Sequence, residues 1–212
     1  MPYIWLFIGC LGLILSIFGL YIPNIQYFDT NTVVWMSQHR FDIFNEIAVF
    51  LSYIGGLPSM LFICGIWCLK HYQTKNYVNI IVICSGLLGS AAIGWILKFW
   101  FNRPRPELIY QMVETYGASF PSAHSIYAAT FSCLIMLIYR QHVQVKLIMF
   151  FACLWFIVMG FSRVYLAAHF PSDVLAGWSI AFIWIAVLWL IFSQFVQGNN
   201  KLFLEKNLNE VE

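Results

Sequence analysis

The chain has 212 residues, of which 61 % are hydrophobic and 19 % aromatic, while only 9 % are Asp, Glu, Lys or Arg. Soluble domains carry roughly a quarter charged residues, so this composition excludes a water-soluble globular protein, and it is too apolar for a disordered chain. The net charge of +2 is too small for a nucleic-acid-binding protein. We therefore expect a single integral membrane domain over residues 1–212.

Charge-free stretches locate the expected membrane spans, because a bilayer core takes about 20 mainly apolar residues in helical form. The first stretch is too long for a signal peptide and no small-residue cleavage site follows it, so we expect it to be retained as a helix. The fold predicted is all-α, a six-transmembrane-helix bundle. Its spans are residues 3–22, 47–69, 76–97, 122–139, 147–162 and 174–194.

Residues 23–46, between the first and second predicted spans, are the least regular part of the chain. The run from Thr30 to Thr32 can cap a helix that continues through Phe44, with Val34 and Phe41 on one face. We predict an interfacial helix here that flanks the site described below. The alternative is a plain loop packed on the bundle.

All six cysteines fall inside the predicted spans and are expected to be buried, apolar and unpaired. Cys64 and Cys68 lie four residues apart, but no other ligand accompanies them, so no metal site is expected there. Residues 198–212 form a polar tail of mixed charge, which we expect to be a frayed cytoplasmic helix.

The distribution of basic residues sets the expected orientation. With six spans, both termini share one side with the loops after the second and fourth spans. This side has six Lys or Arg residues against five on the other, which also has six of the nine carboxylates. By the positive-inside rule, both termini are expected to be cytoplasmic. If Lys98, Arg105 and Arg163 lie on the opposite side because the site needs them there, they can be set aside. The count of basic residues then becomes six against two.

The loops after the third and fifth predicted spans emerge on the same membrane face, because each follows an odd number of crossings. Ionisable groups beside a bilayer are costly, and they indicate a functional site. The first loop covers residues 98–124 and the second residues 162–173. The cluster that they bring together consists of Lys98, Arg105, Ser122, His124, Arg163, His169 and Asp173.

The residue types in these loops suit phosphoryl transfer. Three cations match a phosphate whose charge spreads in the transition state, and the helix that opens near His124 offers free N–H groups to an anion. His169 and Asp173 lie four apart, so the carboxylate can orient the imidazole as a nucleophile. His124 can then protonate the leaving oxygen and later activate water. No metal or other cofactor is required by this scheme.

The loop motifs resemble the three signatures of the type-2 phosphatidic acid phosphatase superfamily, which also includes lipid pyrophosphate phosphatases and vanadium haloperoxidases. They are Lys-x6-Arg-Pro over residues 98–106, Pro-Ser-x-His over residues 121–124, and Ser-Arg-x5-His-x3-Asp over residues 162–173. The resemblance implies His169 as the nucleophile, His124 as the general acid and Asp173 as the orienting carboxylate. It implies that phosphate is bound by Lys98, Arg105, Ser122, Ala123 and Arg163.

One position departs from the family pattern, which usually has glycine where this chain has Ala123. If the backbone there needs a positive φ, alanine costs on the order of 1 kcal/mol. If the position only donates its N–H to phosphate, alanine serves equally well.

Each site residue also has a structural interpretation. Lys98 alone would be read as an anchor that extends to the membrane surface, and Asp173 as the N-cap of the last helix. Arg103 has the wrong spacing from Lys98 for the motif, so a structural or headgroup role is favoured for it. Ser119 and Ser172 are interpreted as loop or capping residues. Residues 107–117 are a candidate segment for headgroup choice.

We therefore expect a multi-pass enzyme of the cell (inner) membrane, with its site on the extracytoplasmic side. It would remove the terminal phosphate of undecaprenyl pyrophosphate, phosphatidylglycerophosphate or phosphatidic acid. Its expected partners are this lipid and the bilayer; the oligomeric state is left open. The alternatives are a phosphotransferase with another envelope acceptor, and a transporter or scaffold with a degenerate site. The second is disfavoured because no expected catalytic residue is missing.

Overall fold

The structure is a computed structural model that describes the backbone of residues 2–209 and the side chains of residues 2–193. Within these residues it contains helices and no strands, which confirms the all-α class. A single turn of 3₁₀ helix, η1, covers Leu108–Tyr110. The α-helices are α1 (Pro2–Gly19), α2 (Pro23–Gln38), α3 (Asp42–Ile54), α4 (Leu57–Gln73), α5 (Tyr77–Phe101), α6 (Ala123–Ile138), α7 (Val145–Tyr165) and α8 (Pro171–Asn209).

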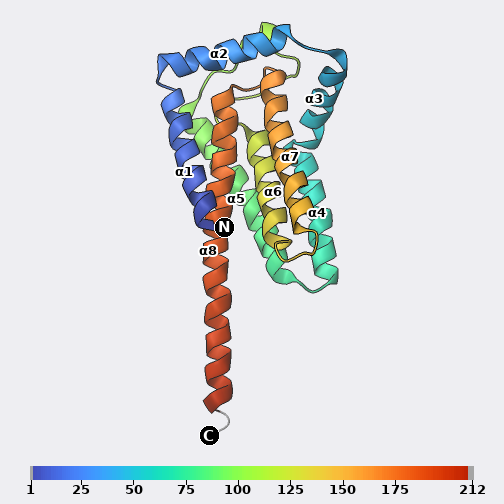
Figure 1. Cartoon of the computed structure of the whole chain (residues 1–212), viewed down its shortest axis with the longest axis vertical. Coiled ribbons are helices and arrows are strands. Elements are labelled where there is room, and N and C mark those ends of the chain that lie inside the picture. The colour runs from blue at the N-terminus through green and yellow to red at the C-terminus, as the bar shows by residue number, and fades with distance from the viewer. Residues whose placement is uncertain (1, 210–212) are drawn as a thin grey trace.

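Helix α6 is the centre of the bundle and packs against α5, α7 and α8 (Figure 1). Helix α1 lies along α8, α4 packs on α5, and α3 packs on α7. Helix α2 lies across one end of the bundle, where it contacts α7 and α8 (Figure 1). The other helices expose many large apolar side chains outward, including Phe7, Phe62 and Phe150. Such an apolar outer surface is what a lipid environment requires.

Four helices are long and apolar enough to cross a membrane, namely α1, α5, α7 and the part of α8 up to Ser193. Helices α3 and α4 together make a fifth candidate, since they pass the same test as a bent pair. Helix α6 is apolar but has only 16 residues. The count of six spans therefore stays a prediction.

The predicted continuous helix over residues 47–69 is wrong, because the chain bends by 61° between α3 and α4. Gly55 and Gly56 occupy the break, and a proline follows in the first turn of α4. Glycine and proline both disfavour a helix interior, so they place the break here. Ser52 thus lies in the last turn of α3, where backbone carbonyls lack helical partners.

The helix in the 23–46 region differs from the predicted one, which was to start at Thr30–Thr32 and continue through Phe44. Helix α2 starts seven residues earlier, with Pro23 at a position that tolerates the missing N–H. It ends before Arg40, whose guanidinium donates to the carbonyls of Tyr165 at 2.9 and 3.2 Å and Tyr110 at 2.7 Å. These contacts tie the segment just after α2 to Tyr110 and to the end of α7. An interfacial position for α2 remains a prediction.

The last predicted span ended at residue 194, whereas α8 continues as a helix to Asn209 and so includes most of the predicted polar tail. Residues 210–212 lie outside the described residues. Burial of all six cysteines is also wrong. Cys10 and Cys84 are on the outer surface of the bundle, where lipid accommodates an apolar thiol as well as a protein core does.

The start of α6 lies close against α8 because Gly177 has no side chain. A Cβ atom at this position would lie 2.8 Å from the carbonyl oxygen of Ser122 and 3.2 Å from the amide nitrogen of Ile126. Both are backbone atoms, which cannot swing aside as a flexible side chain can. Gly177 therefore fixes where the residues at the start of α6 lie.

Replacing Gly177 by alanine is expected to destabilise the protein by about 1–3 kcal/mol, the usual cost of overpacking. Phosphate release should also fall, because the start of α6 would be displaced. Gly65→Ala in α4 is the matched control, since a Cβ there would meet no atom within 4 Å. Thermal unfolding and phosphate release, both measured in detergent, check this. Equal stability and activity in the two variants would contradict the close packing at Gly177.

Candidate active site

The loops after α5 and α7 lie at the same end of the bundle, the end that α2 covers (Figure 1). A cavity of about 700 Å³ lies there. Six of the eight predicted site residues line it, while Ser122 and Asp173 are fully buried behind it. The six are Lys98, Arg105, Ala123, His124, Arg163 and His169.

His169 lies between a carboxylate and a guanidinium. Its Nδ1 atom is 3.6 Å from Oδ2 of Asp173, slightly beyond a hydrogen bond, and Nε2 is 3.3 Å from Nη1 of Arg105. An arginine only donates and a carboxylate only accepts, so this arrangement favours a proton on Nδ1 and a lone pair on Nε2. Ser119 closes the gap, since its hydroxyl is 3.5 Å from Nδ1 and donates to Oδ2 at 2.5 Å.

Burial is the main cause that lowers the pKa of His169 to about 4; the nearby Asp173 carboxylate opposes the shift and the Arg105 guanidinium adds to it. The free imidazole is therefore neutral at pH 7. A neutral ring keeps the lone pair that attack on phosphorus needs.

Asp173 lies beside His169 and also stabilises the start of α8, but from inside the first turn and not as the predicted N-cap, because α8 already begins at Pro171. It lies in the first turn of α8, and its Oδ2 atom accepts the backbone N–H of Phe170 at 2.9 Å, the reciprocal contact of a capping box. The same oxygen faces His169, while Oδ1 accepts from Arg103 at 2.6 Å. The carboxylate thus fixes the start of α8 and lies beside the imidazole.

Lys98 and Arg105 both hold the segment before α6. Helix α5 ends at Phe101 and is capped by Asn102, whose left-handed backbone (φ 40°) suits asparagine; Lys98 therefore lies in the last turn. The Lys98 ammonium donates to the carbonyl of Ala118 at 2.6 Å. The Arg105 guanidinium donates to the carbonyls of Tyr116, Gly117 and Ala168. The two cations therefore line the cavity with positive charge and also fix its wall.

Arg163 and His124 share a partner, Ser52, at the break between α3 and α4. The Arg163 side chain is almost completely buried and donates to the Ser52 hydroxyl at 2.7 Å. Nε2 of His124 lies 3.0 Å from the Ser52 carbonyl oxygen. A carbonyl only accepts, so Nε2 carries a proton. Sequence reasoning missed Ser52, because only the bend brings it to this cavity.

The segment at the start of α6 explains why alanine can stand at position 123. Ala123 is the first residue of α6 and is not among the left-handed residues, so its backbone needs no glycine. Ser122 is the N-cap: its hydroxyl accepts the Ser125 N–H at 3.4 Å and the Ser125 hydroxyl at 2.9 Å, and its own N–H donates to the carbonyl of Asp173 at 3.0 Å. Ser122 thus holds the helix start, where Ala123 lines the cavity.

Arg103, Asp29 and Ser172 form a second set of contacts that the motifs did not indicate. Arg103 bonds to both carboxylates, Asp29 and Asp173, and Ser172 bonds to Asp29. Ser119 and Ser172 are therefore more than loop or cap residues. The one available signal for Asp29 was its isolation, since it is the only carboxylate before position 42.

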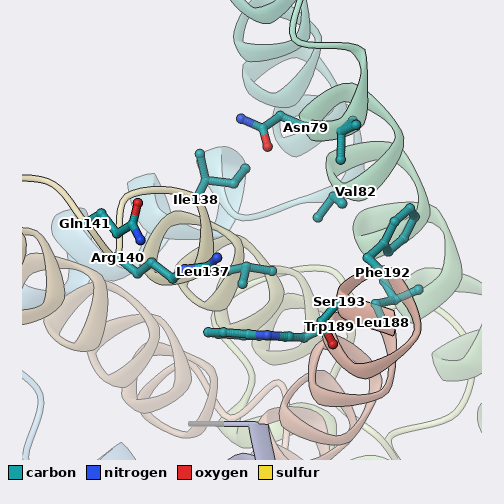
Figure 2. Close-up of a pocket in the computed structure, with 11 residues that line it drawn as sticks. Asn79, Val82, Leu137, Ile138, Arg140, Gln141, Leu188, Trp189, Phe192 and Ser193 are labelled. Carbon is teal, nitrogen blue, oxygen red and sulfur yellow. The ribbon is translucent and has the colours of Figure 1, made fainter. Parts of the chain in front are cut away.

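The predicted headgroup segment also lies at the cavity. Residues Val113, Glu114, Thr115, Tyr116 and Gly117 form part of its wall. A second cavity of about 370 Å³ lies at the other end of the bundle, between α5, α6 and α8 (Figure 2). Its guanidinium, Arg140, lies 4.9 Å from the ring centroid of Trp189, and it contains none of the predicted site residues.

Comparisons with known proteins agree with the motifs. The sequence model of the PAP2 superfamily matches residues 79–197, more than half of the chain. The undecaprenyl-diphosphatase BcrC of Bacillus subtilis (strain 168) is 27 % identical over 166 residues, which cover 76 % of this chain and 80 % of that protein. Phosphatidylglycerophosphatase B of the same organism is 34 % identical over 147 residues, covering 66 % of this chain and 70 % of that protein.

A solved structure shows the same fold. The crystal structure of a transmembrane PAP2-type phosphatidylglycerolphosphate phosphatase from Bacillus subtilis superposes with a TM-score of 0.74 over 89 % of this chain and 95 % of that chain, at 24 % identity. The match to the PAP2 sequence model confirms the family predicted from the three loop motifs. The chain is a multi-pass membrane protein that belongs to the PAP2 superfamily.

Proposed function

We propose that the protein is a lipid phosphatase that removes the terminal phosphate of a lipid phosphate or diphosphate through a phosphohistidine on His169. The observation that carries the proposal is the cavity itself. A neutral imidazole flanked by Asp173 lies in it beside three cations, Lys98, Arg105 and Arg163.

In the first step, Nε2 of His169 attacks the terminal phosphorus, and the bond from phosphorus to the leaving oxygen breaks. The proton on Nδ1 stays directed at Asp173, which stabilises the positive ring. The three cations and the N–H of Ala123 stabilise the charge on the transferred phosphoryl oxygens. His124 takes a second proton, on Nδ1, from the terminal phosphate, keeps the Nε2 proton on the Ser52 carbonyl and gives the Nδ1 proton to the leaving oxygen.

In the second step, a water molecule replaces the lipid product. Neutral His124 takes a proton from this water, whose oxygen attacks the phosphohistidine, and the bond from phosphorus to Nε2 breaks. Inorganic phosphate leaves with the proton that His124 took from the water, and both histidines return to their starting protonation states. The donor set is cationic, which suits phosphate directly, whereas Mg²⁺ prefers several oxygen ligands. The reaction is therefore proposed to be independent of metal.

The cavity wall supports a lipid substrate. Trp95 and Phe99 of α5 line the cavity and are also 65 % and 91 % exposed on the outer surface of the bundle. The wall is therefore continuous with the apolar surface that faces lipid, and a hydrocarbon tail can stay in the bilayer while the phosphate reaches His169. Undecaprenyl diphosphate is our first candidate, followed by phosphatidylglycerophosphate and phosphatidic acid. The first two are named in the relatives described above.

Phosphate release from each of these lipids by purified protein in detergent, with EDTA present, tests the proposal. We expect release with EDTA equal to release without it, fastest with the diphosphate. An absolute need for Mg²⁺ would refute metal independence. Transfer of label to an added envelope lipid in place of free phosphate would indicate a phosphotransferase.

The site is proposed to face the extracytoplasmic side of the cell membrane, with the N-terminus in the cytoplasm. Leu108 at the site end is 83 % exposed and Val143 in the loop at the other end is 95 % exposed. Cysteine variants at these two positions form a matched pair for labelling in intact cells, with the parent protein as background. An impermeant reagent should label Leu108→Cys and spare Val143→Cys; the reverse pattern would overturn the orientation.

A further inference from the structure

The guanidinium of Arg103 lies between two buried carboxylates. Its Nη1 atom donates to Oδ1 of Asp173 at 2.6 Å and to the hydroxyl of Ser172 at 2.8 Å, and Nη2 donates to Oδ2 of Asp29 at 2.8 Å. The ring of Phe170 packs on the guanidinium, 4.2 Å from its central carbon. The Arg103 side chain is only 12 % exposed, so water competes little with these contacts.

Asp29 ties helix α2 to the start of α8. Its side chain is 1 % exposed, and Oδ1 accepts the backbone N–H of Ser172 at 3.1 Å. The Ser172 hydroxyl donates to Oδ2 of the same carboxylate. Asp29 therefore holds Ser172, the residue before Asp173, through the Ser172 backbone N–H, and it holds Arg103 through an ion pair. All of these contacts join segments that are about 70 or more residues apart in the chain.

The contact with Arg103 decides which oxygen of Asp173 faces the imidazole. Because Oδ1 is taken by the guanidinium, Oδ2 is the oxygen that remains near Nδ1 of His169 and bonded to Ser119. Without Arg103, only the contacts of Oδ2 with Ser119 and the Phe170 N–H would hold the carboxylate, and Oδ1 would be free to turn toward the nearby cations of the cavity. The imidazole would then lose the acceptor that keeps its proton on Nδ1 and its lone pair on Nε2.

We propose that Asp29 and Arg103 are positioning residues of this enzyme, a pair that holds the Asp173 carboxylate in the orientation in which it supports His169. The proposal rests on the phosphohistidine function proposed above. Neither residue lines the cavity, so neither contacts the substrate. Removal should therefore slow the chemical step while leaving substrate binding nearly unchanged.

The test compares kcat and KM for phosphate release by Arg103→Ala, Arg103→Lys and Asp29→Asn. We expect Arg103→Ala to lower kcat about 10- to 100-fold, the scale seen when outer partners that orient a functional histidine are removed, with KM within about twofold. Arg103→Lys should recover part of kcat, since an ammonium keeps the charge but cannot match both carboxylates as a planar guanidinium does. Asp29→Asn should lower kcat by a smaller factor.

Two matched controls separate positioning from general stability. Arg40→Ala removes another arginine that joins the end of α2 to α7, but one that donates to backbone carbonyls and does not contact Asp173. Asp42→Asn neutralises an exposed carboxylate at the same end of the bundle. Both controls should keep kcat within about twofold of the parent, on the scale of substitutions away from the site. The midpoint of thermal unfolding is measured for every variant, so that kcat is compared only between folded proteins.

A double variant gives the decisive readout, because residues that act through one group are not additive. If Arg103 acts through Asp173, adding Arg103→Ala to Asp173→Asn should cause less than about a twofold further loss of kcat. The same 10- to 100-fold loss in both backgrounds would overturn the proposal, as would a raised KM with unchanged kcat. If Arg103→Ala keeps the parent kcat while His169→Ala is inactive, the positioning role of Asp29 and Arg103 is refuted but the phosphohistidine function is not. If His169→Ala is active, the phosphohistidine function itself is refuted.

Discussion

Replacing His169 by alanine is expected to lower kcat for lipid phosphate release by about 10³-fold or more, the usual scale for losing a nucleophile. In the structure the imidazole is the group that has Asp173 on one side and a cation of the cavity on the other. Alanine leaves the phosphate cradle but no atom that can form the covalent intermediate. Because His169 is buried, alanine also removes packing, so the thermal midpoint of the variant is measured beside its activity.

His39→Ala is the matched control, since His39 lies at the same end of the bundle but is exposed and stacks on Trp35. Its kcat should stay within about twofold of the parent. Both variants are compared by phosphate release from undecaprenyl diphosphate, with thermal midpoints to show that each is folded. Activity retained in His169→Ala would contradict the proposed chemistry.

The second large effect is expected at His124, and it should depend on the leaving group. A lipid monophosphate ester releases a strongly basic alkoxide, which needs a proton as the bond breaks. A lipid diphosphate releases a lipid monophosphate, which is a much weaker base. His124→Ala should therefore lower kcat/KM about 10²- to 10⁴-fold on phosphatidic acid, the range for general acid catalysis, and clearly less on undecaprenyl diphosphate.

The comparison uses kcat/KM because this ratio reports the steps up to the phosphohistidine, before His124 acts on water. His142→Ala, in an exposed loop at the other end of the bundle, serves as the control and should change neither value. Equal losses on the two lipids would show that His124 does not protonate the leaving oxygen.

The part of the site that the sequence predicted is the part that lies within short motifs. Charge is so scarce in this chain that Lys98, Arg105 and Arg163 stand out at the ends of apolar stretches. Helix direction alternates between spans, so the parity of the loops already brings His169 and Arg105 to one end. Both inferences need only the local composition of the chain and the number of membrane spans before each loop, and both can be read from the sequence.

The parts that could not be predicted depend on contacts between distant segments. Asp29 reaches Arg103 across 74 positions and Ser52 reaches Arg163 across 111, and nothing in the local pattern of Asp29 or Ser52 names these partners. The bend that brings Ser52 to the cavity follows from Gly55, Gly56 and a proline, but these residues interrupt an apolar stretch of full span length. Hydropathy alone therefore indicated one straight helix.

The covalent intermediate tests the central claim most directly. The His124→Ala variant should accumulate it, because water activation is removed while His169 remains. Purified variant is incubated with undecaprenyl diphosphate labelled with ³²P on its terminal phosphate, quenched in alkali and digested, and the labelled peptide is identified. We predict label on His169, stable in base and lost in acid, and none in a His169→Ala protein. Label on another residue, or turnover by an unlabelled protein, would contradict a mechanism through phosphohistidine at this position.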